Sequence, residues 1–573
     1  MLIVFIVLFV INLILSFEEN THILGIYMFN IVSGSMEPTL EINDVVVVQK
    51  CEASQLKKDD IITDLRQSFK IINTFKIEWD KEKFLFNYIV FYAHSQKHLN
   101  RSQLHSLLLG KIAHCGNDEF TVIVFSDPSP RMEERMTSSG LRIVNTNVFD
   151  KKTLYREWTG GGHRIHASDD AWETNKDLTL LFGLNTADFL KKYNHPNTEP
   201  IIYKKNCIGV DGYESIQQLF YVLNNTIDYC VLRNHECLPD EYTVEGHGDI
   251  DLLVENKNYI AYLTLAKQIF PENYRVYHTI NISGQEVPFD FRYIGDNYYD
   301  LLWQKEILKN RKLTKSLFYT PNDEDQYYSL LYHAYIQKFQ VKEDYIPKLT
   351  EYGQKIGVAF HPNITNTISQ LDAYMQNKTY EYIKPQDITV IYNLDNLKES
   401  SYAYRFGELI KRTHEEGNNG YTYQSLVYEK ENSFIKRGTS WLLENEKCFL
   451  TKLRSESFFP SIISADTSQH PSILEISRIE GKEFISFFAD VNHQRKCYIQ
   501  SFIKETIKIL EVLFNNNVCH RDFLPGNLII APKDKRCQVH LIDFGWAIDF
   551  NETNIKCPKD LGGTYASPKG YSD

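Results

Sequence analysis

Apolar residues recur along this chain with two different spacings. Over residues 497–514 they fall three to four positions apart, which predicts a helix with one apolar face. Two other runs, Phe86–Tyr92 and Phe120–Phe125, are rich in aromatic and β-branched residues and predict buried strands. The pattern therefore predicts a mixed α+β protein.

The N-terminal stretch Met1–Phe17 follows neither spacing, because its only polar side chains are Asn12 and Ser16. A helix of this length reaches about 26 Å, the short edge of what spans a bilayer. A cleaved signal peptide is the alternative, but the basic n-region and a small-residue cleavage site are missing. We therefore predict an uncleaved transmembrane anchor on a single-pass membrane protein whose bulk lies in the cytoplasm.

Length and charge narrow the classes of protein to which the chain can belong. A chain of 573 residues is too long for one hydrophobic core and predicts three or four modules. A net charge of −12, from 62 basic and 74 acidic residues, argues against nucleic acid as a partner. The ten cysteines include no CxxC pair, which argues against a zinc ribbon and favours reduced thiols.

A polar segment, Ser33–Leu40, precedes the predicted strand Val45–Val48. This segment resembles the start of type I signal peptidases, and the resemblance implies that Ser35 is a nucleophile. A serine hydroxyl needs a base to act in this way. No residue stands in the full base motif of that family, and the candidates are Lys70, Lys111 and His114. The alternative is an inherited β segment without proteolytic activity.

Three consecutive glycines, Gly160–Gly162, come shortly before the sequence His166-Ala167-Ser168-Asp169. The His-x-Ser-Asp pattern resembles the active-site turn of nucleoside diphosphate kinases, which implies that His166 takes a phosphoryl group. The alternative, which we favour, is a structural turn in which Ser168 or Asp169 caps the next helix.

Two acidic residues, Asp249 and Asp251, begin an apolar strand, and side chains two apart in a strand point to the same face. A third acid, Asp290, stands in a later apolar strand. Carboxylates of this kind bind Mg²⁺. Residues 205–375 thus resemble the nucleotidyltransferase superfamily, which implies a metal-bound nucleotide. The Gly-Ser dipeptide that grips the triphosphate in that superfamily is missing, and Leu232-Arg233-Asn234 stands nearby instead.

The C-terminal region carries two loops joined by a predicted hairpin. The first is His520-Arg521-Asp522-Phe523-Leu524-Pro525-Gly526-Asn527, and the second is Asp543-Phe544-Gly545. Their order and spacing resemble the catalytic and metal loops of protein kinase-like phosphotransferases. The resemblance implies that Asp522 accepts the proton of the attacking hydroxyl and that Asn527 and Asp543 hold Mg²⁺ against ATP.

Other nucleotide contacts are expected upstream of these loops. Lys436 ends an apolar strand and is the candidate for the α- and β-phosphates, and Glu446 on the next helix is its expected partner, with Glu444 as the alternative. No glycine-rich phosphate loop is recognisable, because Tyr404–Glu408 contains one glycine.

The expected phosphoryl acceptor follows from the residues around the catalytic loop. Leu524 stands where Ser/Thr protein kinases usually carry lysine, and the Pro-Gly-Asn ending resembles small-molecule kinases of the aminoglycoside, choline and lipopolysaccharide core type. This resemblance implies a sugar, or a glycan precursor, as the acceptor. The chain ends soon after Gly545, so we expect an incomplete C-lobe.

The prediction is thus an ATP-dependent phosphotransferase fused to a nucleotidyltransferase-like domain. The alternatives are a membrane-anchored signal-peptidase-like serine endopeptidase and a non-enzymatic scaffold. The expected modules are a transmembrane anchor (1–17), a signal-peptidase-like β segment (18–63), an α+β domain of unknown role (64–200), a nucleotidyltransferase-like α/β domain (201–380) and a two-lobed kinase-like domain (385–573).

Overall fold

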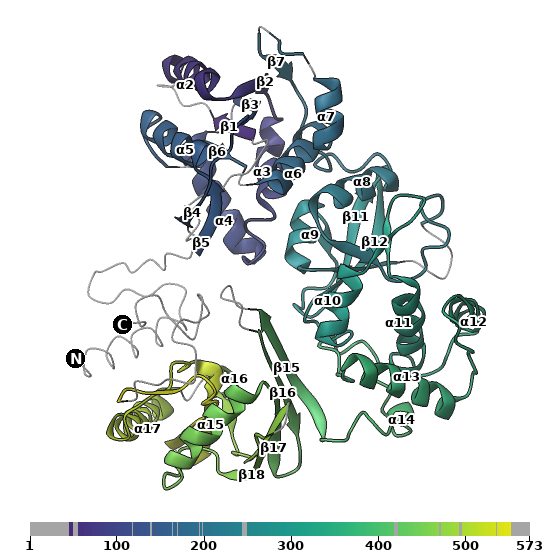
Figure 1. The fold of residues 1–573 in the computed structure, drawn as a ribbon, viewed down its shortest axis with the longest axis vertical. Coiled ribbons are helices and arrows are strands. Elements are labelled where there is room, and N and C mark those ends of the chain that lie inside the picture. The colour runs from purple at the N-terminus through teal and green to yellow at the C-terminus, as the bar shows by residue number, and fades with distance from the viewer. Residues whose placement is uncertain are drawn as a thin grey trace. The chain divides into compact units, whose positions relative to one another are not determined.

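The described chain forms two compact units (Figure 1). The computed structural model describes residues 45–49, 55–116, 119–137, 140–162, 164–168, 170–193, 195–197, 199–242, 249–416, 422–468, 471–491, 495–533 and 536–551. The first unit comprises the described part of residues 32–380 together with 385–399, and the second comprises 381–384 and the described part of 400–573.

The first unit begins with a five-stranded sheet in the order β6-β1-β3-β2-β7. Val46 of strand β1 lies opposite Ile123 of the central strand β3 and Ala167 of the edge strand β6, and both pairs are antiparallel. The strands are β1 (Val45–Gln49), β2 (Lys70–Ile77), β3 (Phe120–Ser126), β6 (Ile165–Ala167) and β7 (Ile201–Tyr203), and a separate hairpin is formed by β4 (Met132–Thr137) and β5 (Gly140–Asn145). The helices of this region are α2 (Gln55–Ser68), α3 (Phe84–Tyr92), α4 (Arg101–Cys115), α5 (Thr146–Trp158), α6 (Ala171–Phe182) and α7 (Thr186–Lys192), and the 3-10 turn η1 (Lys81–Lys83) directly precedes α3.

The run Phe86–Tyr92 is helical in α3, so the prediction of a strand there is wrong. Phe84, Tyr88 and Phe91 fall on one buried face, whereas Phe86 is 45% exposed. A short apolar run cannot be assigned to helix or strand by periodicity alone, and here packing decides. The prediction for Phe120–Phe125 is confirmed, because these residues form the buried part of β3.

A second sheet of the first unit has the order β10-β11-β12-β9-β8. Strands β9 and β12 run parallel, and their register sets Asp290 beside Asp251. The strands are β8 (Tyr229–Val231), β9 (Ile250–Val254), β10 (Lys267–Gln268), β11 (Tyr277–Ile282) and β12 (Gln285–Tyr293), with a small pair β13 (Lys312–Leu313) and β14 (Tyr319–Thr320) beyond them. The helices are α8 (Ile216–Thr226), α9 (Lys257–Leu263), α10 (Leu301–Lys309), α11 (Asp323–Ile336), α12 (Tyr345–Lys355), α13 (Ile364–Lys378) and α14 (Leu394–Leu397).

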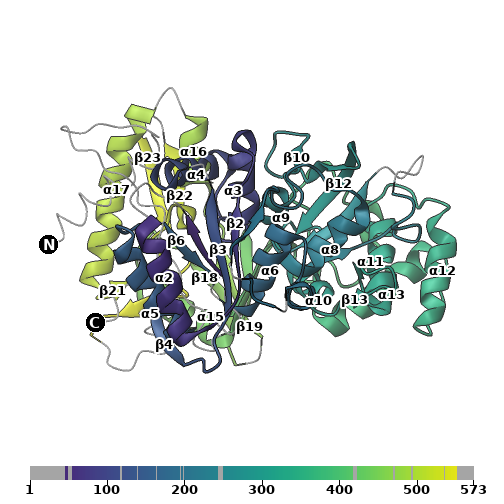
Figure 2. The same ribbon diagram turned by 90° about the horizontal axis from the view of Figure 1, so that it is seen from above.

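One continuous apolar core joins the two sheets of the first unit. It includes Phe75 of β2, Leu180 of α6, Leu223 of α8 and Phe289 of β12. Helix α6 contacts α8, α9 contacts β12, and both views show α8 and α9 beside the second sheet (Figures 1 and 2). Residues before and after position 200 therefore stabilise each other by shared burial.

The second unit has an antiparallel sheet in the order β15-β16-β17-β19-β18, followed by a mainly helical part. The predicted helix over residues 497–514 is confirmed as α17. The elements of the sheet part are β15 (Glu408–Glu416), β16 (Thr422–Glu429), β17 (Ser433–Gly438), α15 (Ser440–Lys452), β18 (Ile462–Asp466) and β19 (Ser472–Ser477). Those that follow are β20 (Lys482–Glu483), α16 (Phe484–Asp490), α17 (Arg495–Asn515), β21 (Val518–Cys519), η3 (Pro525–Asn527), β22 (Leu528–Lys533), β23 (Arg536–Leu541) and β24 (Ile548–Asp549).

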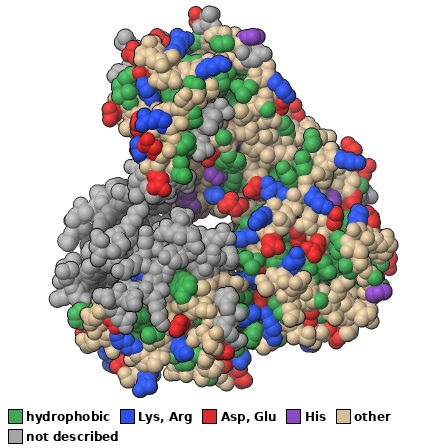
Figure 3. Space-filling model, viewed as in Figure 1, with side chains coloured by type: hydrophobic (Ala, Val, Ile, Leu, Met, Phe, Trp, Pro, Cys, Tyr) green, Lys and Arg blue, Asp and Glu red, His purple; other side chains and the backbone are tan. Residues whose placement is uncertain are grey.

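The prediction of a single-pass membrane protein is contradicted. Among the described residues, no helix combines the length and the apolar character that a bilayer span requires. Residues 1–17, to which the anchor was assigned, lie outside the described residues. On the face drawn in Figure 3, acidic and basic side chains are interspersed, and the described fold is mixed α/β.

Candidate functional site

The loop that contains Asp522 lies between α17 and the hairpin β22–β23 in the second unit. Asn527 Nδ2 donates to Asp522 Oδ2 at 2.8 Å and to the backbone oxygen of Asp522 at 2.9 Å. The hairpin then returns the chain, and Ile542 N donates to Asn527 O at 3.0 Å. Asp543 follows directly, so the fold brings the two predicted loops together.

Two residues of these loops, Arg521 (φ 62°) and Asp543 (φ 70°), have left-handed backbone conformations. Such conformations are costly for residues other than glycine and cluster at functional sites. His520 holds the loops in register, because its Nε2 donates to Ile542 O at 3.1 Å and its ring centroid lies 4.6 Å from that of Phe544. Burial lowers the pKa of His520 to about 4, so the imidazole is neutral.

Lys436 of β17 joins the metal loop to helix α15. Its Nζ lies 2.7 Å and 2.8 Å from the two carboxylate oxygens of Glu446 and 3.1 Å from Asp543 Oδ1. Lys436 and Glu446 are 7% and 1% exposed. The structure therefore brings together Lys436, Glu446 and Asp543 as the sequence predicted, and it is Glu446 rather than Glu444 that pairs with Lys436.

The charges of this site shift one another's pKa. Burial acts to lower the pKa of Lys436, but Asp543 and Glu446 outweigh burial and raise it above its ordinary range. Burial acts to raise the pKa of Asp543, but Lys436 outweighs it and lowers that pKa. For Asp522, burial prevails and raises the pKa, against a hydrogen bond from Asn527. A carboxylate with a raised pKa is a better proton acceptor than an ordinary one.

Asn445 is a site residue that the sequence analysis missed. From the buried face of α15 its Nδ2 donates to Gly545 O at 2.9 Å and to Ala547 O at 2.8 Å. These bonds tie the backbone after Asp543 to the helix that carries Glu446. Only its position next to Glu446 in the sequence could have drawn attention to it.

The segment Tyr404–Glu408, which contains one glycine, showed no recognisable glycine-rich phosphate loop in the sequence. Gly407 immediately precedes β15, whereas a loop that covers phosphates is expected between the first two strands of the sheet. The sequence between β15 and β16 contains Gly417 and Gly420, and these lie outside the described residues. Lys411 of β15 interacts electrostatically with both Asp522 and Asp543.

A second candidate site lies in the first unit. Asp249, Asp251 and Asp290 each present a carboxylate oxygen within 4.8 Å of the others, as the shared register of β9 and β12 requires. Burial raises the pKa of Asp249 and raises that of Asp251 to about 7, with Asp290 adding to both shifts. Three carboxylates held this closely repel one another, and a divalent cation relieves the repulsion.

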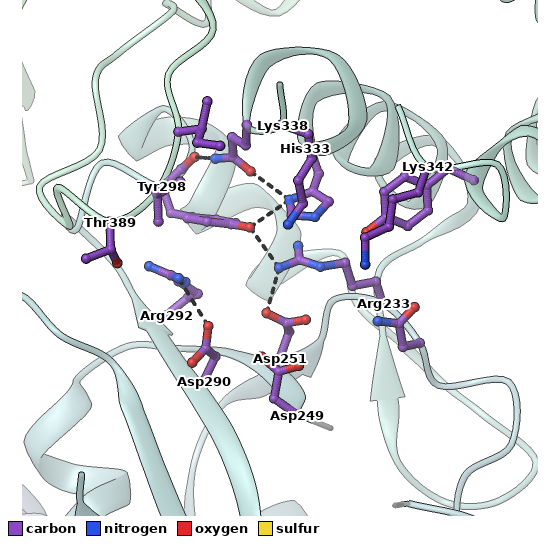
Figure 4. A pocket seen from close by; sticks show the side chains of 15 residues that line it. Arg233, Asp249, Asp251, Asp290, Arg292, Tyr298, His333, Lys338, Lys342 and Thr389 are labelled. Carbon is purple, nitrogen blue, oxygen red and sulfur yellow. Dashed lines mark hydrogen bonds and ion pairs between the residues drawn. The ribbon is translucent and has the colours of Figure 1, made fainter. Parts of the chain in front are cut away.

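Basic side chains surround these carboxylates. Arg233 Nη2 donates to Asp251 Oδ1 at 2.6 Å and to Tyr298 OH at 2.7 Å, and Arg292 Nη2 donates to Asp290 Oδ2 at 3.1 Å. Figure 4 shows the three aspartates at one end of a pocket of about 250 Å³, with Lys338 toward the other. The sequence analysis noted Arg233 only as part of Leu232-Arg233-Asn234, which stands near the place where the nucleotidyltransferase superfamily has its triphosphate-binding Gly-Ser dipeptide.

The donors at both sites fit Mg²⁺. Asp543 supplies carboxylate oxygens, and because Asn527 donates through Nδ2, its Oδ1 is the atom that can ligate a cation. The aspartate cluster of the first unit supplies oxygen atoms only, which hard cations prefer. Mg²⁺ bound at either place would offset the negative charge of the carboxylates that hold it.

The peptidase prediction cannot be placed on the structure, because Ser35 lies outside the described residues. Of its candidate bases, Lys70 is exposed at the start of β2, whereas Lys111 of α4 is buried with Nζ 4.0 Å from the ring centroid of Tyr92. Burial lowers the pKa of Lys111 to about 8. A Ser35 peptidase stays a prediction.

The turn around His166 is partly as expected. His166 lies in β6, and the cap of helix α6 is Asp170, whose side chain accepts a hydrogen bond from Glu173 N, rather than the predicted Ser168 or Asp169. Ser168 instead donates through Oγ to Asp177 at 2.9 Å, because its side chain points into the core. Asp169 lies outside the described residues.

No family model matches the chain. A stretch of 68 residues is 31% identical to "Calcium-dependent protein kinase 3" of Plasmodium yoelii yoelii, covering 12% of this chain and 13% of that protein. A stretch of 152 residues is 26% identical to "Serine/threonine-protein kinase STN8, chloroplastic" of Arabidopsis thaliana, covering 26% of this chain and 27% of that protein. The solved "Crystal structure of monomeric WbdD" matches at 17% identity with a TM-score of 0.19, over 22% of this chain and 33% of that chain.

The similarity to known proteins is thus kinase-like and partial. The chain spans 13% and 27% of the length of these two curated relatives. None of the three names bears on the nucleotidyltransferase-like or the signal-peptidase-like resemblance, so both stay predictions.

Proposed function

We propose that the second unit is an ATP-dependent phosphotransferase that uses Mg²⁺. The observation that supports the proposal most strongly is the contact of Lys436 with both Glu446 and Asp543, at 2.7–3.1 Å, beside the hydrogen-bonded pair Asp522 and Asn527. This set contains a cation for the phosphates, donors for the metal and a base for the acceptor.

The proposed reaction uses each of these residues once. Lys436 binds the α- and β-phosphates of ATP while Glu446 holds its ammonium in place. Asp543 and Asn527 hold the cation, which neutralises phosphate charge. Asp522 orients the acceptor hydroxyl and takes its proton as the oxygen attacks the γ-phosphorus and ADP leaves. The raised pKa of Asp522 favours that proton transfer.

The proposed acceptor is a small molecule with a hydroxyl group, in particular a sugar or a glycan precursor. Leu524, which is 40% exposed, stands two residues after Asp522 and offers no charge to a phosphate or a peptide. The acceptor class rests on the resemblance of the loop to small-molecule kinases.

Transfer of the γ-phosphoryl group from labelled ATP, measured with the full chain, tests the proposal. We expect Mg²⁺-dependent turnover with a sugar acceptor, and Asp522→Asn and Asp543→Asn each to reduce it at least about 100-fold. Asp490→Asn is the matched control, because Asp490 pairs with Lys482 on the surface. Folded wild-type protein that neither binds nor turns over ATP would refute the kinase assignment, whereas transfer to a peptide alone would refute only the acceptor.

A second function is proposed for the first unit, namely transfer of a nucleotidyl group from a nucleoside triphosphate. It is supported by the cluster Asp249, Asp251 and Asp290 facing Arg233 and Lys338 in one pocket. Incorporation of label from the α-phosphorus separates this activity from γ-phosphoryl transfer. Loss of α-label incorporation in Asp251→Asn with γ-transfer intact is the expected result, and equal incorporation by Asp251→Asn would contradict the proposal.

A further inference from the structure

A third cluster of ionisable side chains lies in the first unit, between strand β6 and helix α6, and shares no residue with the two sites above. His166 stands in β6, and Glu173 and Asp177 are one helical turn apart at the start of α6. One ligand atom from each of these three residues lies within 4.8 Å of the other two. Neither proposed reaction uses them.

The separations are close to those of a metal centre. His166 Nε2 lies 3.9 Å from Asp177 Oδ2. Ligand atoms bound tetrahedrally at about 2.1 Å stand about 3.4 Å apart, so this pair of atoms is within roughly 0.5 Å of the separation that a bound ion requires.

Neighbouring groups orient the three ligands. Ser168 Oγ donates at 2.9 Å to Asp177 Oδ2, the oxygen that faces His166. The rings of Phe91 and Tyr92 meet the imidazole edge-on at centroid distances of 5.8 Å and 5.7 Å. A hydrogen-bonded carboxylate and an apolar wall around a histidine are the surroundings that metal ligands usually have.

Lys176 supplies the positive charge that the cluster needs in the absence of an ion. Its Nζ lies 2.6 Å from Asp177 Oδ1 and 3.8 Å from Glu173 Oε1. Lys176 is 3% exposed and Asp177 is fully buried. Buried charges are kept only where they are paired, so a divalent cation and the ammonium of Lys176 compete for the same carboxylates.

We propose that His166, Glu173 and Asp177 form a binding site for a transition-metal divalent cation of the Zn²⁺ class. One imidazole and two carboxylates suit Zn²⁺ or Co²⁺, whereas Mg²⁺ and Ca²⁺ prefer oxygen ligands alone. The partial exposure of His166 (21%) and Glu173 (14%) gives an ion a path to the buried Asp177. Bound metal ties β6 to α6 and stabilises this part of the first unit.

The test is Zn²⁺ and Co²⁺ titration of the full-length protein in competition with a chromophoric chelator. We expect a Zn²⁺ site that His166→Gln weakens at least about 100-fold, whereas His105→Gln, which changes an exposed histidine of α4, leaves its affinity unchanged. Lys176→Gln removes the competing ammonium and is expected to tighten binding about tenfold, a change that a purely structural lysine does not produce.

X-ray absorption of the Zn²⁺-loaded wild-type protein keeps the proposal testable if His166→Gln fails to fold. One imidazole among mainly oxygen ligands is expected, and it separates this site from the aspartate cluster of Asp249, Asp251 and Asp290. An all-oxygen coordination shell, no binding by wild-type protein, or equal affinity of His166→Gln and His105→Gln would each overturn the proposal.

Discussion

Lys436 Nζ lies 2.7 Å from Glu446 Oε1, and both side chains are buried. The pair joins β17 to α15, so moving helix α15 away from the sheet would leave the buried carboxylate of Glu446 without its ammonium partner. The same Nζ reaches Asp543. The ammonium group of Lys436 therefore holds β17, α15 and the loop of Asp543 together. The proposed phosphoryl transfer depends on this arrangement.

Removing one member of this pair is expected to affect both stability and activity. Glu446→Ala removes the nearer of the two carboxylates that pair with the buried Lys436, leaving Asp543, and is expected to lower the free energy of unfolding by about 1.5–3 kcal/mol. Urea unfolding and the rate of γ-phosphoryl transfer measure the two effects. Lys430→Met is the control, because Lys430 pairs with Glu475 at 3.3 Å on the surface, and a change within about 1 kcal/mol is expected. Equal stability of both variants would contradict a buried ion pair.

Asn445→Ala is expected to act through the metal loop. The variant leaves the carbonyl oxygens of Gly545 and Ala547 without their donor and is expected to lower the free energy of unfolding by about 1–3 kcal/mol. Because Asp543 is two residues from Gly545, the affinity for Mg²⁺ and kcat are expected to fall with it. A titration of Mg²⁺ against transfer rate measures this. Asn516→Ala is the control, since Asn516 directly follows α17 and donates to Val512 O in the last turn of that helix. A normal Mg²⁺ dependence of Asn445→Ala would refute the positioning role.

The sequence predicted those site residues whose partners lie close to them along the chain, and it missed those whose partners lie far away. The spacing of Asp522, Asn527 and Asp543 predicted their meeting, because a loop, a hairpin and a second loop leave the chain little choice of path. Asn445 was missed, because its partners lie about one hundred residues along the chain and only the packing of α15 shows them.

Two other errors have different physical causes. Phe86–Tyr92 was assigned to a strand by composition, but its burial on one face depends on α3 packing in the core of the first unit. The membrane anchor was inferred from the apolarity of residues 1–17 alone, and no helix of the described chain supports it. In the aspartate cluster, Asp251 and Asp290 were predicted from strand patterns. Arg233 could not be assigned, because it stands 18 residues before Asp251 in the sequence and only the fold brings the two together.

The buried Lys111 is expected to make the stability of the first unit depend on pH. Its pKa is about 8 in the folded protein and 10.5 in the unfolded chain. Below pH 8 both states are charged and the full cost of burial, about 3 kcal/mol, is present. As pH rises from 8 to 10.5 the folded state loses the proton first, so the cost disappears and stability rises.

Lys111→Met tests whether the stability of the first unit rises with pH because Lys111 loses its charge. The variant is expected to be more stable than wild type at pH 7 by up to about 3 kcal/mol and equally stable above about pH 10. Chemical unfolding at the two pH values measures the difference. Lys97→Met is the control, because Lys97 pairs with Glu255 on the surface. A stability difference that does not change with pH would show that Lys111 acts through packing rather than charge.

Arg233 and Asp251 offer a double-mutant cycle in the first unit. They are 7% and 3% exposed and joined at 2.6 Å, so Arg233→Met leaves Asp251 buried without its main counter-charge and is expected to cost about 3–5 kcal/mol of unfolding free energy. Asp251→Asn is expected to recover a large part of that loss, because the neutral amide needs no cation. The coupling between the two changes is therefore expected to exceed about 1 kcal/mol.

Thermal and urea unfolding of the wild type, both single variants and the double variant complete the cycle. Tyr298→Phe serves as a further variant, because the Tyr298 hydroxyl accepts a hydrogen bond from the same Nη2 of Arg233 at 2.7 Å. Loss of this hydroxyl is expected to lower the free energy of unfolding by only about 1 kcal/mol. Additive effects of Arg233→Met and Asp251→Asn would mean that Arg233 stabilises the fold through Asp290 or through the ring of Tyr298, rather than through Asp251. A nucleotide that binds the pocket is expected to shrink the coupling, because its phosphates compete with Asp251 for the guanidinium.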